Sequence, residues 1–149
     1  MRKVLFVSKN NNHLKFLGEI VTAHIQNGDE VYYVYETPIS AKGAQNAIGA
    51  NPDPVKNLNL NCEVYSFSRP EQLNQLICDI CPRIIYSLYG PSKYGIEKPR
   101  GSKWVLAFHH DLPLQARRSD CDYAVLPNYY WYQLNRRSHG TEGLDETQI

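Results

Sequence analysis

Short apolar runs alternate along this chain with segments whose apolar residues recur at helical spacing. The runs are rich in Val, Ile, Tyr and Phe, which favour buried strands. Leu14, Leu17, Val21 and Ile25 form one helical stripe, and a second stripe separates the third run from the fourth. We expect strands over residues 4–8, 31–35, 62–67, 83–88, 104–108 and 123–126.

The helices between these runs decide how the strands pair. The first helix should stop at Asn27-Gly28, the second should end before Pro82, and a last helix should follow Pro127. A weak helix is expected over residues 41–48. Strands separated by helices pair in parallel through right-handed crossovers. The pattern therefore predicts an α/β fold, a doubly wound parallel sheet that is Rossmann-like, with about six strands in the order 3-2-1-4-5-6.

Length and composition indicate one domain. The chain has 149 residues and no composition break, so we expect a single domain over residues 1–140 and a flexible tail over 141–149. Its formal net charge of +1 gives no field that attracts nucleic acid. No apolar run approaches the ~20 residues that span a bilayer, and the first residues lack a signal-peptide pattern. We therefore expect a cytoplasmic protein with no nucleic-acid partner and no transmembrane segment.

A cluster of titratable residues follows the fifth expected strand, where the apolar run 105–108 leads into His109-His110-Asp111. Ligands of open α/β sheets bind beyond the carboxyl ends of strands, where the winding reverses. His110 and Asp111 are the catalytic candidates: imidazole titrates near neutral pH, and Asp111 can orient it or cap the next turn. A surface histidine at a strand end is the alternative. His109 is a substrate-binding candidate. Neighbouring side chains on a strand diverge, so no metal site is expected.

The turn after the first expected strand contains asparagines and no glycine. A dinucleotide site needs glycines there so that the backbone can approach a pyrophosphate. The chain also lacks a Walker A motif, so neither NAD, FAD nor any other cofactor is expected. Asn10, Asn11 and His13 remain substrate-binding candidates because a helix start can bind a phosphate or hydroxyl group. A simple turn and helix cap is the alternative.

Basic side chains gather in the second half of the chain, around the expected crevice. Tyr89 and Lys93 belong to a loop at the end of the fourth strand, and Arg117 and Arg118 follow the fifth. Loops at strand ends commonly carry function, so we expect these four residues to contact a sugar or a phosphate-bearing substrate. A solvated basic face is the alternative interpretation.

Four cysteines include one C-x-x-C motif, Cys78-Asp-Ile-Cys81. Such a motif can be a redox pair or half of a zinc site. Cys62 and Cys121 are isolated and supply no second pair, and the motif ends a helix instead of beginning one. The favoured interpretation is that these cysteines are small buried hydrophobes.

Several spaced phrases resemble the N-terminal, acceptor-side domain of GT-B class glycosyltransferases. They are the opening Lys3-Val-Leu-Phe-Val-Ser-Lys-Asn10, the phrase Asn27-Gly-Asp-Glu-Val31 before the second strand, the His110-Asp111 pair, and residues 116–127. The resemblance covers about residues 1–138 and extends in part to sugar-nucleotide 2-epimerases. It implies a Rossmann-like domain that binds a nucleotide-sugar and a sugar or phosphate-bearing acceptor, with His110 near the donor sugar.

The chain departs from that family in two respects. Asparagines replace the usual glycine-rich first turn, and these 149 residues contain no counterpart of the family's second Rossmann domain, which holds most of the nucleotide-sugar contacts. The resemblance therefore implies a glycosyltransferase fragment or subunit that needs a second Rossmann domain or partner for activity. The alternative is a non-catalytic Rossmann-like binding or interaction module.

Overall fold

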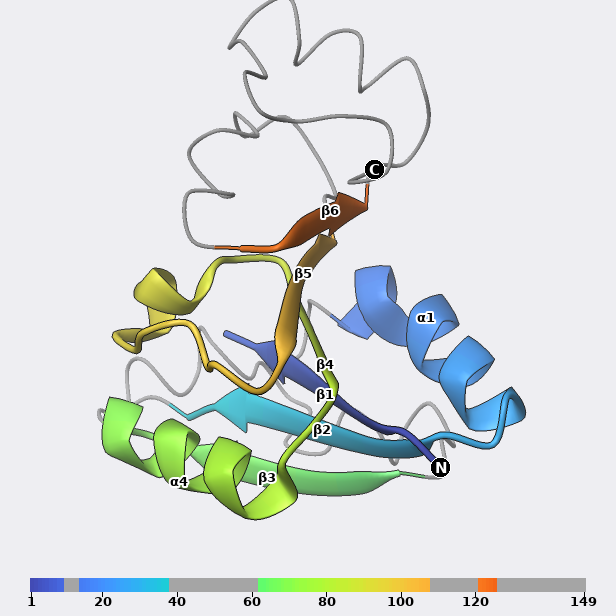
Figure 1. Ribbon diagram of the computed structural model, residues 1–149, viewed down its shortest axis with the longest axis horizontal. Coiled ribbons are helices and arrows are strands. Elements are labelled where there is room, and N and C mark those ends of the chain that lie inside the picture. The colour runs from blue at the N-terminus through green and yellow to red at the C-terminus, as the bar shows by residue number, and fades with distance from the viewer. Residues whose placement is uncertain (10–13, 38–61, 108–120, 126–149) are drawn as a thin grey trace, which may run out of the picture.

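A parallel sheet forms the centre of the molecule in the computed structural model, which describes residues 1–9, 14–37, 62–107 and 121–125. Five strands lie in the order β3-β2-β1-β4-β5, and a three-residue segment, β6, pairs in parallel with the outer side of β5. Figure 1 shows the sheet with α1 and α4 on either side of it. The strands are β1 (Lys3–Ser8), β2 (Glu30–Glu36), β3 (Glu63–Phe67), β4 (Ile84–Ser87), β5 (Lys103–Ala107) and β6 (Tyr123–Val125).

The central strand, β1, is covered on both faces. It pairs with β2 on one side and β4 on the other, with Val4 opposite Val31 and Ile84. Leu5 and Phe6 are fully buried in two different core clusters, because successive side chains on a strand point to opposite faces. This two-sided burial explains why the run is continuously apolar instead of alternating.

Helix α1 (Leu14–Gln26) covers one face of the sheet, where Leu17 and Val21 pack in the same cluster as Phe6. The helix ends in a Schellman motif: Asp29 N donates to His24 O and Gly28 N donates to Ile25 O, each at 3.0 Å. Gly28 has φ +83°, a left-handed conformation that glycine adopts without a steric penalty. The Asn-Gly stop signal is therefore confirmed.

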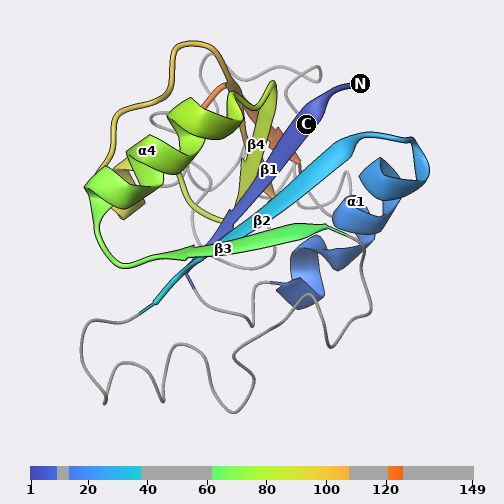
Figure 2. The ribbon, with the colours of Figure 1, turned by 90° about the horizontal axis from the view of Figure 1, so that it is seen from below.

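Helix α4 (Pro70–Ile80) covers the opposite face, where Leu73, Ile77 and Ile80 pack in the cluster that contains Leu5 and Trp104. Figure 2 shows the two helices on opposite sides of the sheet. The helix begins at Pro70, whose fixed φ suits the first helical position. Gln72 Oε1 accepts hydrogen bonds from the backbone N–H groups of Ser68 and Arg69, at 2.7 and 3.1 Å.

The five-stranded parallel sheet and its two helices confirm the predicted Rossmann-like α/β fold. The predicted count of six strands is not established, because β6 has only three residues and the chain beyond it lies outside the described residues. The predicted helices over 41–48 and after Pro127, and the tail over 141–149, also lie outside. The domain boundaries therefore stay predictions. No helix among the described residues is long and apolar enough to cross a membrane.

The prediction that the cysteines of the C-x-x-C motif are buried is wrong, because Cys78 and Cys81 are both exposed. The buried stripe of α4 consists of Leu73, Ile77 and Ile80. Cys78 follows Ile77 by one residue, which rotates its side chain by about 100° away from that stripe. Cys81 ends the helix in a left-handed conformation, with φ 53°, and its N–H donates to Ile77 O at 2.9 Å.

Candidate functional site at the carboxyl edge of the sheet

The strand order places a topological switch point between β1 and β4. From β1 the chain proceeds through α1 to β2, whereas from β4 it proceeds in the other direction to β5. Ligands of doubly wound folds bind in the crevice outside the carboxyl ends of the strands at such a point. Between β4 and β5 lies a 3-10 turn, η2 (Pro91–Tyr94), which Figure 1 shows in yellow at the carboxyl end of the sheet.

Buried hydroxyl groups join the strand ends at this point. The Tyr94 hydroxyl lies 2.6 Å from Ser87 Oγ and donates to Val7 O at 3.3 Å, so η2 is held to both β1 and β4. On the other side of β1, the Tyr33 hydroxyl donates to Ser8 Oγ at 2.8 Å. Burial raises the pKa of Tyr94 and of Tyr33 well above the ordinary value. Both phenols therefore stay neutral at physiological pH and act as fixed hydrogen-bonding groups.

An ion pair lies beside these hydroxyl groups. Lys9 Nζ is 3.0 Å from Glu36 Oε2 and 5.2 Å from the centre of the Tyr94 ring. Both charged side chains are half-buried, which strengthens their attraction relative to a pair in bulk water. Glu36 ends β2, where Rossmann folds often carry an acid that binds a ribose. Sequence reasoning did not identify Lys9 as its partner.

Two of the predicted binding residues, Tyr89 and Lys93, lie together at the end of β4. Lys93 Nζ is 5.5 Å from the centre of the Tyr89 ring, within the range of a cation–π contact. Tyr89 is half-buried, and its carbonyl oxygen accepts a hydrogen bond of 2.9 Å from Trp104 Nε1. Because Trp104 is fully buried, the core fixes the backbone of Tyr89. The exposed Lys93 ammonium is available to a ligand above a positioned aromatic ring.

The remaining predicted site residues lie outside the described residues, and their roles stay predictions. The described chain reaches the carboxyl edge at Lys9 and at Ala107, which ends β5. The predicted residues follow these two positions: Asn10, Asn11 and His13 after β1, and His109, His110, Asp111, Arg117 and Arg118 after β5.

A second polar cluster, which sequence reasoning missed, lies at the opposite edge of the sheet. His24 Nδ1 is 2.7 Å from Asp29 Oδ2, and His24 Nε2 is 2.9 Å from the Tyr86 hydroxyl. Arg2 donates to both oxygens of Asp29, at 3.3 and 3.1 Å. The His24 hydrogen bond, with further help from Arg2, lowers the pKa of Asp29 to about 2 although burial acts in the opposite direction.

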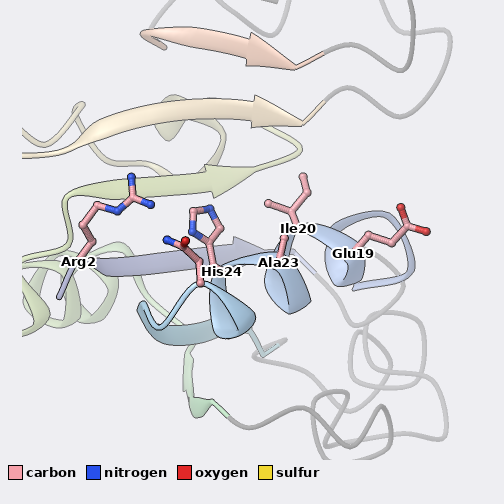
Figure 3. A pocket seen from close by; sticks show the side chains of 6 residues that line it. Arg2, Glu19, Ile20, Ala23 and His24 are labelled. Carbon is pink, nitrogen blue, oxygen red and sulfur yellow. The ribbon is translucent and has the colours of Figure 1, made fainter.

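The second cluster borders an open pocket of about 490 Å³. Figure 3 shows the side chains of Arg2 and His24 at one end of it and those of Ile20 and Glu19 at the other. Both nitrogens of the His24 ring are hydrogen-bonded within the protein, so the imidazole has no nitrogen left for a ligand. The cluster therefore connects α1, the start of β2 and β4, and the carboxyl edge remains the candidate ligand site.

Metal binding finds no support in the described part of the chain, where no group of three or more His, Cys, Asp or Glu side chains is placed to hold an ion. Comparison with protein families and with characterised proteins finds no match to this chain.

Proposed function

We propose that this chain is the acceptor-side domain of a glycosyltransferase that transfers a sugar from a nucleotide-sugar donor and needs a second Rossmann domain or partner for activity. One observation carries the proposal: at the switch point, the exposed Lys93 ammonium lies 5.5 Å from the centre of the half-buried Tyr89 ring. Lysine binds phosphate as a point charge, and an aromatic face can stack on a sugar. The GT-B resemblance of residues 1–138 supplies the reaction class.

The proposed chemistry assigns different roles to the two sides of the crevice. Lys93 and Tyr89, after β4, contact a sugar or phosphate-bearing acceptor, with Arg117 and Arg118 adding charge from the segment after β5. His110 contacts the donor sugar across the crevice, and Asp111 orients its imidazole. Asn10, Asn11, His13 and His109 complete the binding surface. No metal or organic cofactor is part of this scheme.

A non-catalytic Rossmann-like binding or interaction module is the second candidate. The Lys9–Glu36 ion pair favours it, because a lysine already paired at 3.0 Å has less charge to offer a phosphate. The asparagine-rich first turn also keeps the backbone further from a pyrophosphate than glycines would. Under this alternative the crevice binds a small ligand and no group is transferred.

A transfer assay separates the two candidates. The purified chain is incubated with a panel of nucleotide sugars and sugar or sugar-phosphate acceptors, alone and joined to a GT-B nucleotide-binding domain. We expect no appreciable transfer by the chain alone, because donor and acceptor must be brought together by both domains. The joined form should transfer sugar, and His110→Ala should lower its rate while leaving the melting temperature within a few degrees.

Three results would count against the transferase. Turnover by the isolated chain would show that no second domain is needed. Ligand binding without transfer in any joined form would favour the binding module. If His110→Ala unfolds the domain, that residue is structural, and its Asp111→Asn neighbour variant must then lower the rate for the scheme to survive.

A further inference from the structure

Two exposed thiols line one cavity at the amino edge of the sheet, away from the carboxyl-edge crevice. Cys78 and Cys81 are free and exposed, and both border a pocket of about 310 Å³ between the end of α4 and the loop before β5. Arg100 and Ser102 supply the opposite wall. Structural cysteines are usually buried, so two exposed thiols at one cavity call for a chemical explanation.

The backbone holds these two thiols at a distance that a disulfide can bridge. Residues three apart on a helix lie on the same face, with Cα atoms ~5 Å apart. Disulfides form between Cα atoms about 4.4–6.8 Å apart. Cys78 lies within α4 and Cys81 follows its last residue, so helical geometry sets their separation. The expected Cα separation therefore lies within the range that a disulfide spans.

Cys81 has an unusual conformation that brings its sulfur toward Cys78. It is the one non-glycine residue with positive φ among the described residues, at 53°, in a position that glycine usually occupies at a helix end. Its Sγ donates to the carbonyl oxygen of Cys78 at 2.9 Å. The second thiol is therefore folded back over the turn that carries the first.

The cavity carries a positive charge beside the thiols. Arg100 is exposed and lines the pocket, and none of the ion pairs among the described residues involves it. Ser102 Oγ donates to Pro82 O at 2.6 Å, which ties the Arg100 loop to the turn after Cys81. A small molecule that reaches the thiols thus meets a guanidinium group that favours a carboxylate.

We propose that Cys78 and Cys81 are a redox-active dithiol that closes to an intramolecular disulfide by exchange with a small anionic disulfide bound beside Arg100. The thiolate of one cysteine attacks the small disulfide, forms a mixed disulfide and releases one small thiol. The other cysteine then attacks the protein sulfur of that mixed disulfide and releases the second small thiol. The two cysteine protons go to the released thiolates, so the protein is oxidised by two electrons and the small disulfide is reduced. The proposal is independent of the function at the carboxyl edge.

Glutathione disulfide is the probe for this reaction, and intact mass with peptide mapping is the readout. The reduced chain should lose the mass of two hydrogen atoms within the peptide that spans residues 70–83, with no glutathionyl group retained. Cys78→Ser and Cys81→Ser should each retain one glutathionyl group on the remaining cysteine of the pair. Cys62→Ser and Cys121→Ser are matched controls that should behave as the unmodified sequence does.

A charge variant tests the role of the cavity. Arg100→Gln should slow closure by glutathione disulfide about two- to fivefold, the effect of one exposed charge contact, and should not slow closure by neutral hydroxyethyl disulfide. If Arg100→Gln slows closure by the two disulfides to the same extent, or slows neither reaction, the assignment of Arg100 is overturned. Two stable glutathionyl groups on the 70–83 peptide, no oxidation of it, or a disulfide to Cys62 or Cys121 would overturn the dithiol itself.

Discussion

Asp29 and His24 form a short hydrogen bond of 2.7 Å between Oδ2 and Nδ1, and it ties the end of α1 to the start of β2. The Asp29 side chain is only 5% exposed, so its negative charge is stabilised mainly by hydrogen bonds and ion pairs within the protein and little by water. Arg2, at the edge of β1, supplies a second charged partner at 3.1 Å. The amino edge of the sheet therefore depends on a carboxylate that must stay ionised.

Acid should weaken the fold through Asp29. The pKa of this carboxyl is about 2 in the folded protein, against an ordinary value of 3.8, so the unfolded chain binds its proton first as the pH falls. The stabilisation is complete above about pH 4 and is lost as the pH approaches 2. Asp29→Asn should cost about 1–2 kcal/mol at neutral pH and flatten this acid slope. Urea unfolding between pH 7 and pH 2 measures both effects, and an unchanged slope in the variant would refute the assignment.

Tyr86→Phe should destabilise the protein by about 1 kcal/mol, because it removes the hydroxyl that lies 2.9 Å from His24 Nε2 and leaves a half-buried ring nitrogen without its partner. The stacked contact between the Phe6 and Tyr86 rings, with centres 5.0 Å apart, is kept. Tyr65→Phe is the matched control, since the Tyr65 hydroxyl donates to Glu63 on an exposed surface. Chemical denaturation should show a clear loss in the free energy of unfolding for Tyr86→Phe and a negligible change for Tyr65→Phe. Equal losses in the two variants would argue against a role for the His24 contact.

Gly28→Ala should cost about 1 kcal/mol although the added methyl group meets no atom within 4 Å. The cost comes from the left-handed backbone, φ +83°, that the Schellman motif requires. Gly101→Ala also adds a methyl group in open space, but its φ lies outside the left-handed range, so its effect should stay within about 0.5 kcal/mol. Thermal unfolding of the pair measures the difference, and similar melting temperatures would show that α1 does not depend on this cap.

Local sequence patterns predicted most of the fold, because strands and helices are specified by residues near one another in sequence. The continuous apolar runs form strands, and the first helix ends at the Asn27-Gly28 stop as predicted. The predicted buried stripe of the second helix is seen in Leu73, Ile77 and Ile80. The observed strand boundaries differ from the predicted ones by no more than one residue at each end. Cys62 and Arg83, for example, precede β3 and β4 instead of beginning them.

The side-chain contacts within the two polar clusters were harder to predict, because they join residues that are far apart in the sequence. His24 and Tyr86 are 62 residues apart, and no local pattern marks them as partners. The loop that supplies Tyr89 was identified from its place at a strand end, but its second tyrosine, Tyr94, is 3% exposed and belongs to the core. Exposure of Cys81 follows from a left-handed turn that sequence alone does not reveal.

Removal of the Lys93 charge should weaken ligand binding at the carboxyl edge. Lys93→Gln takes away an exposed ammonium group above the Tyr89 ring, and its loss should raise the Kd of a sugar phosphate about three- to tenfold. Arg83→Gln is the matched control because Arg83 is exposed just before β4, at the other end of the strand. Isothermal titration calorimetry compares the variants, and a similar loss in both would mean that net charge, not the site, sets the affinity.

Amide chemical-shift mapping of the isotope-labelled chain with nucleotide sugars and sugar phosphates tests the carboxyl-edge site most directly. The account predicts saturable shifts concentrated at the ends of β1 and β4, in Ser8, Lys9, Ser87, Tyr89 and Lys93, because the winding of the sheet reverses between these strands. Shifts centred instead on the amino edge, around Arg2 and His24, or no saturable shifts with any of these ligands, would contradict it.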